Sequence, residues 1–361
     1  MFTINFFDEF YVTVEGEKEI SKELRQYYDH LCTEEKVQDP DLSVIEWDSK
    51  PSPNVLLGEP ESYYGRDGDQ FIIKQHNNHI SIDNSWDTIR TSPDTSRYFI
   101  SILIEFELRR QLSQNGFALV HASGIKLNGR VLIFPAWRHT GKTNTMLSLI
   151  QDGGGYLSDD RVWVHESGSV LGYPLPVNML PYNFESFPDL LDISGIERVR
   201  SKIANYLDSR FTMERSIIDK IVIFITRYYI EAGLGKVVQL HELLPDCEFI
   251  SEAQIDELVF LRTEKGADIN IRDVNKQAAF TELTTTSDYE WNSTLREYCR
   301  SYDTLFDDGE KLDDLDHLIN REEEIFKNVI EETEIRRLGL PREEDWLENE
   351  VTKRVRDTFG L

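Results

Sequence analysis

Residues 120–164 read VHASGIKLNGRVLIFPAWRHTGKTNTMLSLIQDGGGYLSDDRVWV, and this stretch decides the fold. It begins with two apolar runs separated by Asn128-Gly129, which is the strongest short-range signal of a β-hairpin. The second run leads into the loop AWRHTGKT, and the residues after it have the apolar spacing of a helix that ends at three glycines. YLSDD and RVWVH follow as strand candidates. The order strand, loop, helix, strand predicts an α/β fold.

The loop itself, residues 136–143, matches the pattern G-x-x-x-x-G-K-[ST] at every defined position except the first, where Ala136 replaces glycine. A buried strand before it and a helix after it would make backbone N–H groups and the positive helix end converge on an anion. We therefore expect Lys142 to reach the β- and γ-phosphates of a nucleotide and the Thr143 hydroxyl to ligate Mg²⁺. The predicted nucleotide-binding residues are Ala136, Arg138, His139, Thr140, Gly141, Lys142 and Thr143.

Two other interpretations of this loop stay open. GKT sometimes opens a helix by chance, without binding anything. The loop is also compatible with a degenerate site that binds nucleotide or sulfate and does no chemistry, because a Cβ at Ala136 restricts the backbone. Arg138 and His139 occupy positions that many such loops keep small.

Two adjacent acids, Asp159 and Asp160, follow the strand after the helix, so we expect them at a strand end near the loop, where ligands bind in open α/β sheets. One of them would hold Mg²⁺ and the other would accept a proton from an attacking hydroxyl. His121 lies on the strand that pairs with the strand before the loop. An isolated strand histidine is usually a buried packing residue, but this position also suits a residue that orients one of the acids.

These residues resemble the C-terminal kinase domain of HPr kinase/phosphorylase and the HPr-kinase-like proteins, which are related to the ATP-dependent PEP carboxykinases. The histidine, the GK[ST] and the DD stand at the separations typical of that family. The resemblance is clear over about 50 residues and extends loosely over 117–265. It implies a PEP carboxykinase/HPr kinase-like P-loop domain, with ATP and Mg²⁺ as cofactors and a hydroxyl, often a serine, as phosphate acceptor.

Carried over residue by residue, the resemblance makes Asp159 the base, gives Asp160 an assisting and metal-binding role with Thr143, and lets His121 position the acid pair. The first, third and fourth loop positions depart from the family pattern, and no later glutamate segment matches clearly. Residues 1–92 do not resemble the family's N-terminal domain, so neither HPr as substrate nor its hexamer is transferred. A homo-oligomer stays open.

Composition narrows the range of partners and compartments. The chain has 361 residues with 39 Lys plus Arg against 66 Asp plus Glu, a formal net charge of −27, which would repel nucleic acids and anionic lipids. Such acidity suits a protein kept soluble at high salt or simply an acidic cytosolic one. Its three cysteines lack CxxC spacing, and neither a leader nor an apolar run of membrane-spanning length is evident. We expect a cytoplasmic protein without nucleic acid or membrane partners.

Three regions are predicted along the chain: a small N-terminal α+β domain (1–92), a nucleotide-binding domain (93–285) and an acidic helical C-terminal region (286–361). In the first, strands are expected in FTINFF, FYVTV, FIIKQ and HISID, the last two joined at Asn77-Asn78, with a helix over 20–31. A helix capped by Asp94 or Thr95 and ending near Asn115-Gly116 leads into the second. Further strands are expected at 221–225 and 255–263.

The leading hypothesis is a Mg²⁺-dependent kinase that transfers the ATP γ-phosphate to a hydroxyl of a protein, peptide or small metabolite. The main alternative is a nucleotide-binding regulatory or scaffold protein whose altered loop does not turn over. A carboxykinase is a third reading, since the folds are related.

Overall fold

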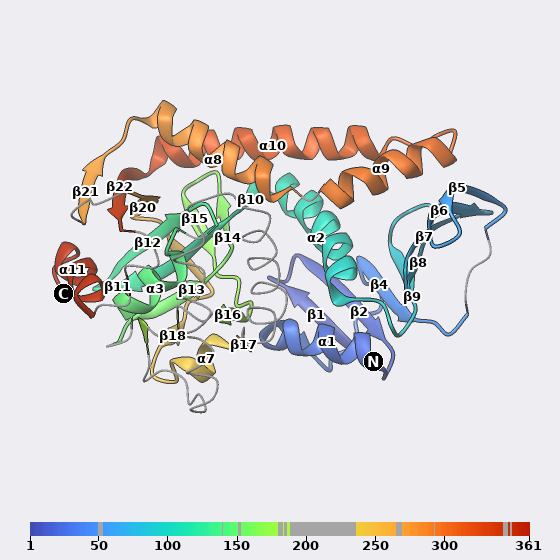
Figure 1. Cartoon of the computed structure of the whole chain (residues 1–361), viewed down its shortest axis with the longest axis horizontal. Coiled ribbons are helices and arrows are strands. Elements are labelled where there is room, and N and C mark those ends of the chain that lie inside the picture. The colour runs from blue at the N-terminus through green and yellow to red at the C-terminus, as the bar shows by residue number, and fades with distance from the viewer. Residues whose placement is uncertain are drawn as a thin grey trace, which may run out of the picture. The chain divides into compact units, whose positions relative to one another are not determined.

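A computed structural model of the chain describes residues 1–49, 53–138, 140–150, 153–179, 183, 186–187, 236–264, 269–291, 293–341, 346 and 349–361 (Figure 1). Its content is mixed α/β, as predicted. The strand expected at 221–225 lies outside the described residues. Within the described part of the chain, no helix is long and apolar enough to cross a bilayer.

The chain divides into two compact units. Unit 1 comprises Met1–Leu119 and Ser287–Lys327, and unit 2 comprises Val120–Thr286 and Asn328–Leu361. This division differs from the three consecutive regions predicted from the sequence, because each unit is built from two separate segments of the chain. Helix α2 (Arg97–Gln114), expected to lead into the nucleotide-binding domain, belongs to unit 1, where Phe106 packs edge-on against Trp86 with ring centroids 5.7 Å apart.

Unit 1 is built on a nine-stranded sheet with the order β3-β1-β2-β4-β9-β8-β7-β6-β5. Its strands are β1 (Phe2–Phe6), β2 (Phe10–Glu15), β3 (Cys32–Thr33), β4 (Leu42–Glu46), β5 (Val55–Glu59), β6 (Ser62–Asp67), β7 (Gln70–Gln75), β8 (Asn78–Ile82) and β9 (Thr88–Thr91). The four strands expected there are confirmed. The β7–β8 turn is one residue earlier than predicted, because Gln75 pairs with Asn78 and His76 takes a positive φ of 55°.

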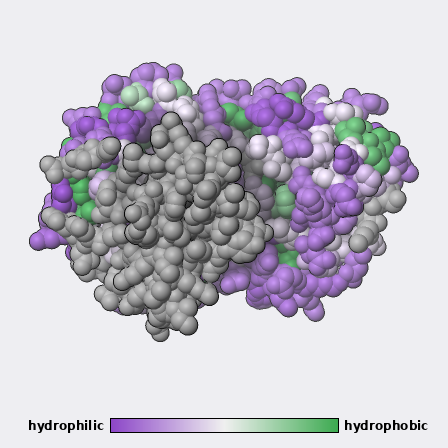
Figure 2. All heavy atoms as spheres, in the orientation of Figure 1, coloured by the Kyte–Doolittle hydropathy of each residue, from purple (hydrophilic) through white to green (hydrophobic). Residues whose placement is uncertain are grey.

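Helices complete unit 1. The helix expected over 20–31 is shorter, α1 (Glu19–Tyr27), and a 3₁₀ turn (Asp29–Leu31) follows it. The N-cap of α2 is Ser96 rather than Asp94 or Thr95, since its hydroxyl accepts a hydrogen bond from the Tyr98 amide. Helix α9 (Ser293–Leu305) and most of α10 (Lys311–Glu332) belong to the same unit. The face of this unit seen in Figure 2 is mainly hydrophilic, with apolar residues gathered near the edge strand β5, where Val55 and Leu56 are exposed.

Unit 2 is built on a seven-stranded sheet with the order β18-β13-β11-β12-β20-β22-β21. Strands β12, β20 and β22 run parallel, whereas β11 pairs antiparallel with both β12 and β13. The strands are β11 (Ala122–Leu127), β12 (Arg130–Pro135), β13 (Gly155–Ser158), β18 (Glu248–Phe249), β20 (Glu257–Thr263), β21 (Asn270–Asp273) and β22 (Glu334–Leu340). The predicted Asn128-Gly129 hairpin is confirmed, with φ values of 51° and 81° that suit a type I′ turn.

Smaller elements surround this sheet. Strand β10 (Phe117–Val120) ends where unit 2 begins, and the hairpin of β14 (Val162–His165) and β15 (Ser169–Leu171) pairs with β19 (Glu252–Gln254). Strands β16 (Val177–Met179) and β17 (Lys236–Val238) form a pair. The helices are α3 (Lys142–Ile150), α7 (Leu240–Leu243), α8 (Lys276–Glu290), which continues into unit 1, and α11 (Asn349–Thr358).

The prediction that the chain is helical beyond residue 286 is wrong at β22. Residues 334–340 continue the helical apolar spacing of α10, but they pair in parallel with the full length of β20 and antiparallel with β21. Ile335, Leu338 and Leu340 are buried there. Burial against the sheet therefore overrides the local helical pattern.

Glu257 connects three strands of the sheet in unit 2. It is fully buried, and it accepts hydrogen bonds from Arg130 on β12, at 2.9 Å, and from Arg336 on β22. Breaking a buried ion pair by removing one partner typically costs about 3–5 kcal/mol; because both arginines are partly exposed, we expect Glu257→Ala to lower the free energy of unfolding by about 2–3 kcal/mol. Urea unfolding measures this, with Glu248→Ala on the short strand β18 as the exposed-acid control. Equal losses in the two variants would contradict the assignment.

Candidate active site at one edge of the unit 2 sheet

Three strands bring the predicted site residues to one edge of the sheet. Strands β12 and β13 both run antiparallel to β11, which lies between them. The start of β11 therefore lies beside the ends of β12 and β13, as the register pairs Ala122↔Pro135 and Gly124↔Ser158 record. His121 directly precedes β11, the loop follows β12, and Asp159-Asp160 follow β13, so all three segments meet at this edge.

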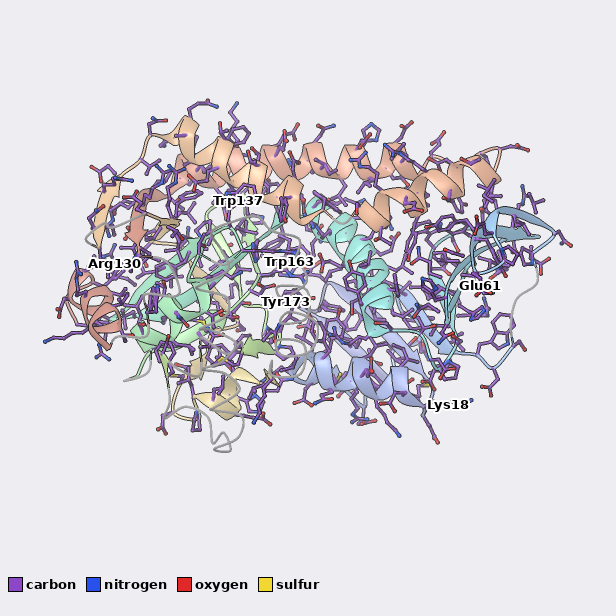
Figure 3. The ribbon with its side chains drawn as sticks, viewed as in Figure 1. Lys18, Glu61, Arg130, Trp137, Trp163 and Tyr173 are labelled. Carbon is purple, nitrogen blue, oxygen red and sulfur yellow. The ribbon has the colours of Figure 1, made fainter. Side chains whose placement is uncertain are left out.

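The loop connects β12 to α3 at the end of the strand away from Arg130 (Figure 3). The Thr140 hydroxyl donates to the Trp137 carbonyl at 2.7 Å, which closes a turn within the loop. Gly141 has φ +85°, a left-handed conformation that favours glycine. Helix α3 begins at Lys142, so the positive end of its dipole lies at this edge.

Lys142 pairs with Asp160. Its Nζ lies 2.8 Å from Asp160 Oδ1 and 3.2 Å from the carbonyl oxygen of the same residue. The lysine side chain is only 9% exposed, whereas the carboxylate of Asp160 is 44% exposed. Burial alone would raise the pKa of Asp160, but the positive charge of Lys142, supported by His121 and Arg161, holds that pKa well below its usual value. Asp160 is thus an ionised, solvent-facing carboxylate.

Asp159 has a different environment from its neighbour. It is 6% exposed, and its Oδ2 accepts a hydrogen bond of 3.1 Å from the Thr143 hydroxyl. Its Oδ1 is buried and has no hydrogen-bond partner among the described residues. Burial raises the pKa of Asp159 to about 6, against the opposing effect of Lys142. A carboxylate with a pKa near neutrality suits proton transfer.

His121 and Arg161 complete the surroundings of Asp160. His121 Nε2 lies 3.1 Å from Asp160 Oδ1, and Arg161 Nε donates to Oδ2 at 3.3 Å. The contact between His121 and the acid pair was predicted, whereas Arg161 was not. The signal for Arg161 was weak, because an arginine next to two acids in a chain with 66 acids is most simply a surface ion pair.

The remaining predicted loop residues have varied environments. The Ala136 amide donates to the His121 carbonyl at 3.3 Å, and its methyl group is buried in the core. Ala136 therefore packs beneath the loop, and a contact with phosphate stays a prediction. Arg138 is exposed, and Thr140 is half-buried. His139 lies outside the described residues.

Trp346, which the sequence did not single out, packs against the loop. It is almost fully buried, and a Cβ placed on Gly141 would lie 3.3 Å from its Cζ2 atom. Val351 and Val355 of α11 share its hydrophobic cluster with Met146 of α3. Trp346 and α11 therefore pack against the loop and helix α3. The residues around Trp346 in the sequence do not predict this contact. It becomes possible because β22, which precedes Trp346, ends at the same edge of the sheet as the loop.

The residues present fit a divalent cation only in part. Among the described residues, no group of three or more His, Cys, Asp or Glu side chains is arranged to hold a metal ion. Mg²⁺ is commonly bound by one or two carboxylates together with phosphate oxygens and waters. The unpartnered Oδ1 of Asp159, the Thr143 hydroxyl and the exposed carboxylate of Asp160 match that incomplete set.

Neither the comparison with protein-family models nor the search of curated proteins gave a match to this chain. This edge of the unit 2 sheet is the feature of the chain that bears on its function. It combines the start of a helix and a buried lysine, which suit an anion, with two acids. The pKa of one acid is raised and that of the other is lowered, so one suits a proton and the other a cation.

The two aspartates should affect stability in opposite directions. The folded-state pKa of Asp159 is raised from 3.8 to about 6, so its proton binding favours the folded chain in acid, and this contribution is lost as the pH rises through that range. Asp159→Asn should therefore stabilise the metal-free protein by about 1–3 kcal/mol near neutral pH. The gain should shrink as the pH falls below about 6.

Asp160→Asn serves as the matched comparison. The folded-state pKa of Asp160 is lowered, so its ionisation stabilises the folded chain above the unfolded pKa, and this variant should be less stable than the parent near neutral pH. Thermal unfolding in EDTA as a function of pH measures both variants. Stability changes of the same sign would contradict the environments described above.

The contact between Trp346 and Gly141 can be measured against a second glycine of the same unit. Gly129 has a similar φ of +81°, with no atom within 4 Å of a Cβ built there. In urea unfolding, Gly129→Ala should lower the free energy of unfolding by about 1–2 kcal/mol, for the left-handed backbone alone. Gly141→Ala should lower it by about 1 kcal/mol more, because the indole must move. In a Trp346→Ala background this excess should vanish. An unchanged excess would show that Trp346 does not restrict the loop.

Proposed function

We propose that unit 2 is a Mg²⁺-dependent phosphotransferase of the HPr-kinase-like type, which transfers the γ-phosphate of ATP to a hydroxyl, such as that of a serine, in a protein, peptide or small metabolite. One observation carries this proposal. The first two residues of α3, Lys142 and Thr143, are bonded to Asp160 and Asp159 respectively, at the edge where the loop turns into the helix. A phosphate chain at the helix start would lie between a cation and two acids.

Each residue has a role that follows from its environment. Lys142, together with the amides of the loop and of the first turn of α3, binds the phosphates, since these groups carry the positive charge of the edge. Asp159 accepts the proton of the acceptor hydroxyl, because its raised pKa makes it the better base of the two acids. His121 and Arg161 hold the carboxylate of Asp160 in place.

Thr143 and Asp160 would hold Mg²⁺, with Asp159 close by. When bound, the ion would neutralise charge on the transferring phosphate. Catalysis of this kind depends on positioning and electrostatics more than on covalent chemistry. The proposal places this activity in the cytoplasm.

A nucleotide-binding regulatory or scaffold role is the second candidate, and two observations favour it. The side chain of Ala136 fills core space below the loop where the usual motif has glycine, and Trp346 packs against Gly141. Both reduce the freedom of the loop to adjust around a triphosphate. A loop restricted in this way would hold a nucleotide without completing the transfer.

Phosphate transfer from labelled ATP distinguishes the two candidates. With Mg²⁺ and free serine, a serine peptide or a cell lysate as acceptor, the parent protein should form a labelled product. Asp159→Asn should lower the rate by about a hundredfold or more, as expected for loss of a general base, while retaining ATP binding measured by calorimetry. Lys142→Met should lose the binding itself.

Asp246→Asn, which alters an exposed acid of unit 2, is the control and should match the parent. ATP binding without any product would favour the scaffold role. Labelled product that is unchanged by Asp159→Asn would refute the assigned base, and absence of ATP binding would refute both candidates.

A further inference from the structure

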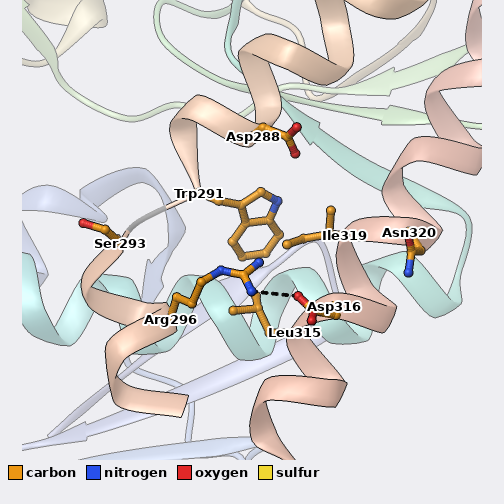
Figure 4. Close-up of a pocket in the computed structure, with 8 residues that line it drawn as sticks. All are labelled: Asp288, Trp291, Ser293, Arg296, Leu315, Asp316, Ile319 and Asn320. Carbon is orange, nitrogen blue, oxygen red and sulfur yellow. Dashed lines mark ion pairs between the residues drawn. The ribbon is translucent and has the colours of Figure 1, made fainter. Parts of the chain in front are cut away.

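Unit 1 contains a cavity of about 580 Å³ that belongs to no site described so far (Figure 4). It lies between the end of α8, the start of α9 and the middle of α10, and all of its lining residues are in unit 1. Its volume is within the range of about 300–1,000 Å³ typical of small-molecule sites. Its lining combines a tryptophan and two aliphatic side chains with charged groups.

Trp291 forms a rigid apolar wall of this cavity. The guanidinium of Arg109 lies 3.5 Å from the ring centroid of Trp291. Arg109 is itself held by Glu322 on α10 through a buried ion pair, with Nε 2.9 Å from Oε1. The Arg109–Glu322 pair therefore lies against one face of the indole. Arg109 already occupies one face of the ring. The rest of the indole offers a ligand apolar surface, apart from the buried Nε1, which has no hydrogen-bond partner among the described residues.

The charges around the cavity are unequal. Arg296 Nη1 pairs with Asp316 Oδ1 at 2.9 Å, which neutralises one acid of the lining. Asp288, on the other side of Trp291 (Figure 4), is exposed and forms no ion pair with any residue that the structure describes. One carboxylate without an ion-pair partner among the described residues thus lines the same cavity as the apolar side chains of Trp291, Leu315 and Ile319, in a chain whose net charge is −27.

These features select one ligand chemistry. An anion would meet Asp288, and the nearby Arg296 is already paired. A bare metal ion would find too few ligands, since no metal-holding cluster is present among the described residues. A neutral apolar molecule would cover the apolar side chains but gain nothing from the carboxylate of Asp288, which is exposed to water. A positively charged group attached to a short hydrocarbon satisfies the carboxylate and covers the apolar wall together.

We propose that this cavity binds an aliphatic ammonium ion, with its charged nitrogen at Asp288 and its hydrocarbon chain against Trp291 and Ile319. The negative charge of the protein would raise the local concentration of such a cation. This site is separate from the phosphotransferase proposal and does not depend on it, because its lining residues and the nucleotide-binding residues belong to different units.

Calorimetric titration with n-butylammonium and n-hexylammonium chloride near neutral pH tests the proposal. Affinity should rise roughly two- to fourfold for each added methylene group, as expected for burial of hydrocarbon. The neutral analogue 1-hexanol should bind about tenfold more weakly than n-hexylammonium, because it lacks the charge-assisted contact. Asp288→Asn should weaken the binding of n-hexylammonium by a similar factor, about tenfold.

Asp308→Asn is the matched control, since it removes an exposed acid elsewhere in unit 1, and it should leave the affinity unchanged. Asp288 is exposed at the end of α8, so circular dichroism should show its variant to be folded. Ile319→Ala should reduce the increase in affinity from n-butylammonium to n-hexylammonium. It should leave the preference for n-hexylammonium over 1-hexanol unchanged. Equal weakening by the two aspartate variants, equal binding of 1-hexanol, or no binding of n-hexylammonium would each overturn the proposal.

Discussion

The ammonium group of Lys142 is the interaction on which the candidate site depends. Two adjacent carboxylates at the end of β13 would repel each other, and burial alone would favour the protonated form of both. Lys142 Nζ is 2.8 Å from Asp160 Oδ1 and so keeps that acid ionised, while Asp159, which is buried and accepts a hydrogen bond from the Thr143 hydroxyl, keeps a raised pKa. Lys142, supported by His121 and Arg161 at Asp160 alone, therefore makes two neighbouring residues chemically different.

Antiparallel pairing explains how this interaction becomes possible. Because β11 runs opposite to both β12 and β13, the residue before β11 and the residues after its two neighbours share an edge. The tight Asn128-Gly129 turn fixes the register of the hairpin, and the register in turn places His121 beside the loop. The buried Glu257 cluster binds the same sheet together near the start of β20. The nucleotide proposal thus rests on strand order as much as on the GKT motif.

Local patterns predicted the parts of this fold that short-range chemistry determines. The hairpin at Asn128-Gly129, the helix after Gly141 and the strand before Asp159 all have turn residues or apolar spacing that define them. The strand β22 was not predicted, because its residues continue a helical pattern and become a strand only by pairing with β20 and β21. Trp346 was missed for a related reason, because its contact with Gly141 joins chain segments that meet only in the folded unit. The cavity beside Trp291 likewise depends on α8, α9 and α10 packing together. Arg161 was missed for another reason: it contacts its sequence neighbour Asp160, and an arginine beside two acids is most simply a surface ion pair.

Carbon-13 NMR of labelled aspartate carboxyl groups can measure the unequal environments of Asp159 and Asp160 one residue at a time. Resonances can be assigned by their loss in the variants at each position. The account predicts that Asp159 titrates with a midpoint near 6, whereas Asp160 stays ionised to well below the usual aspartate range. Two ordinary titrations with similar midpoints would contradict it.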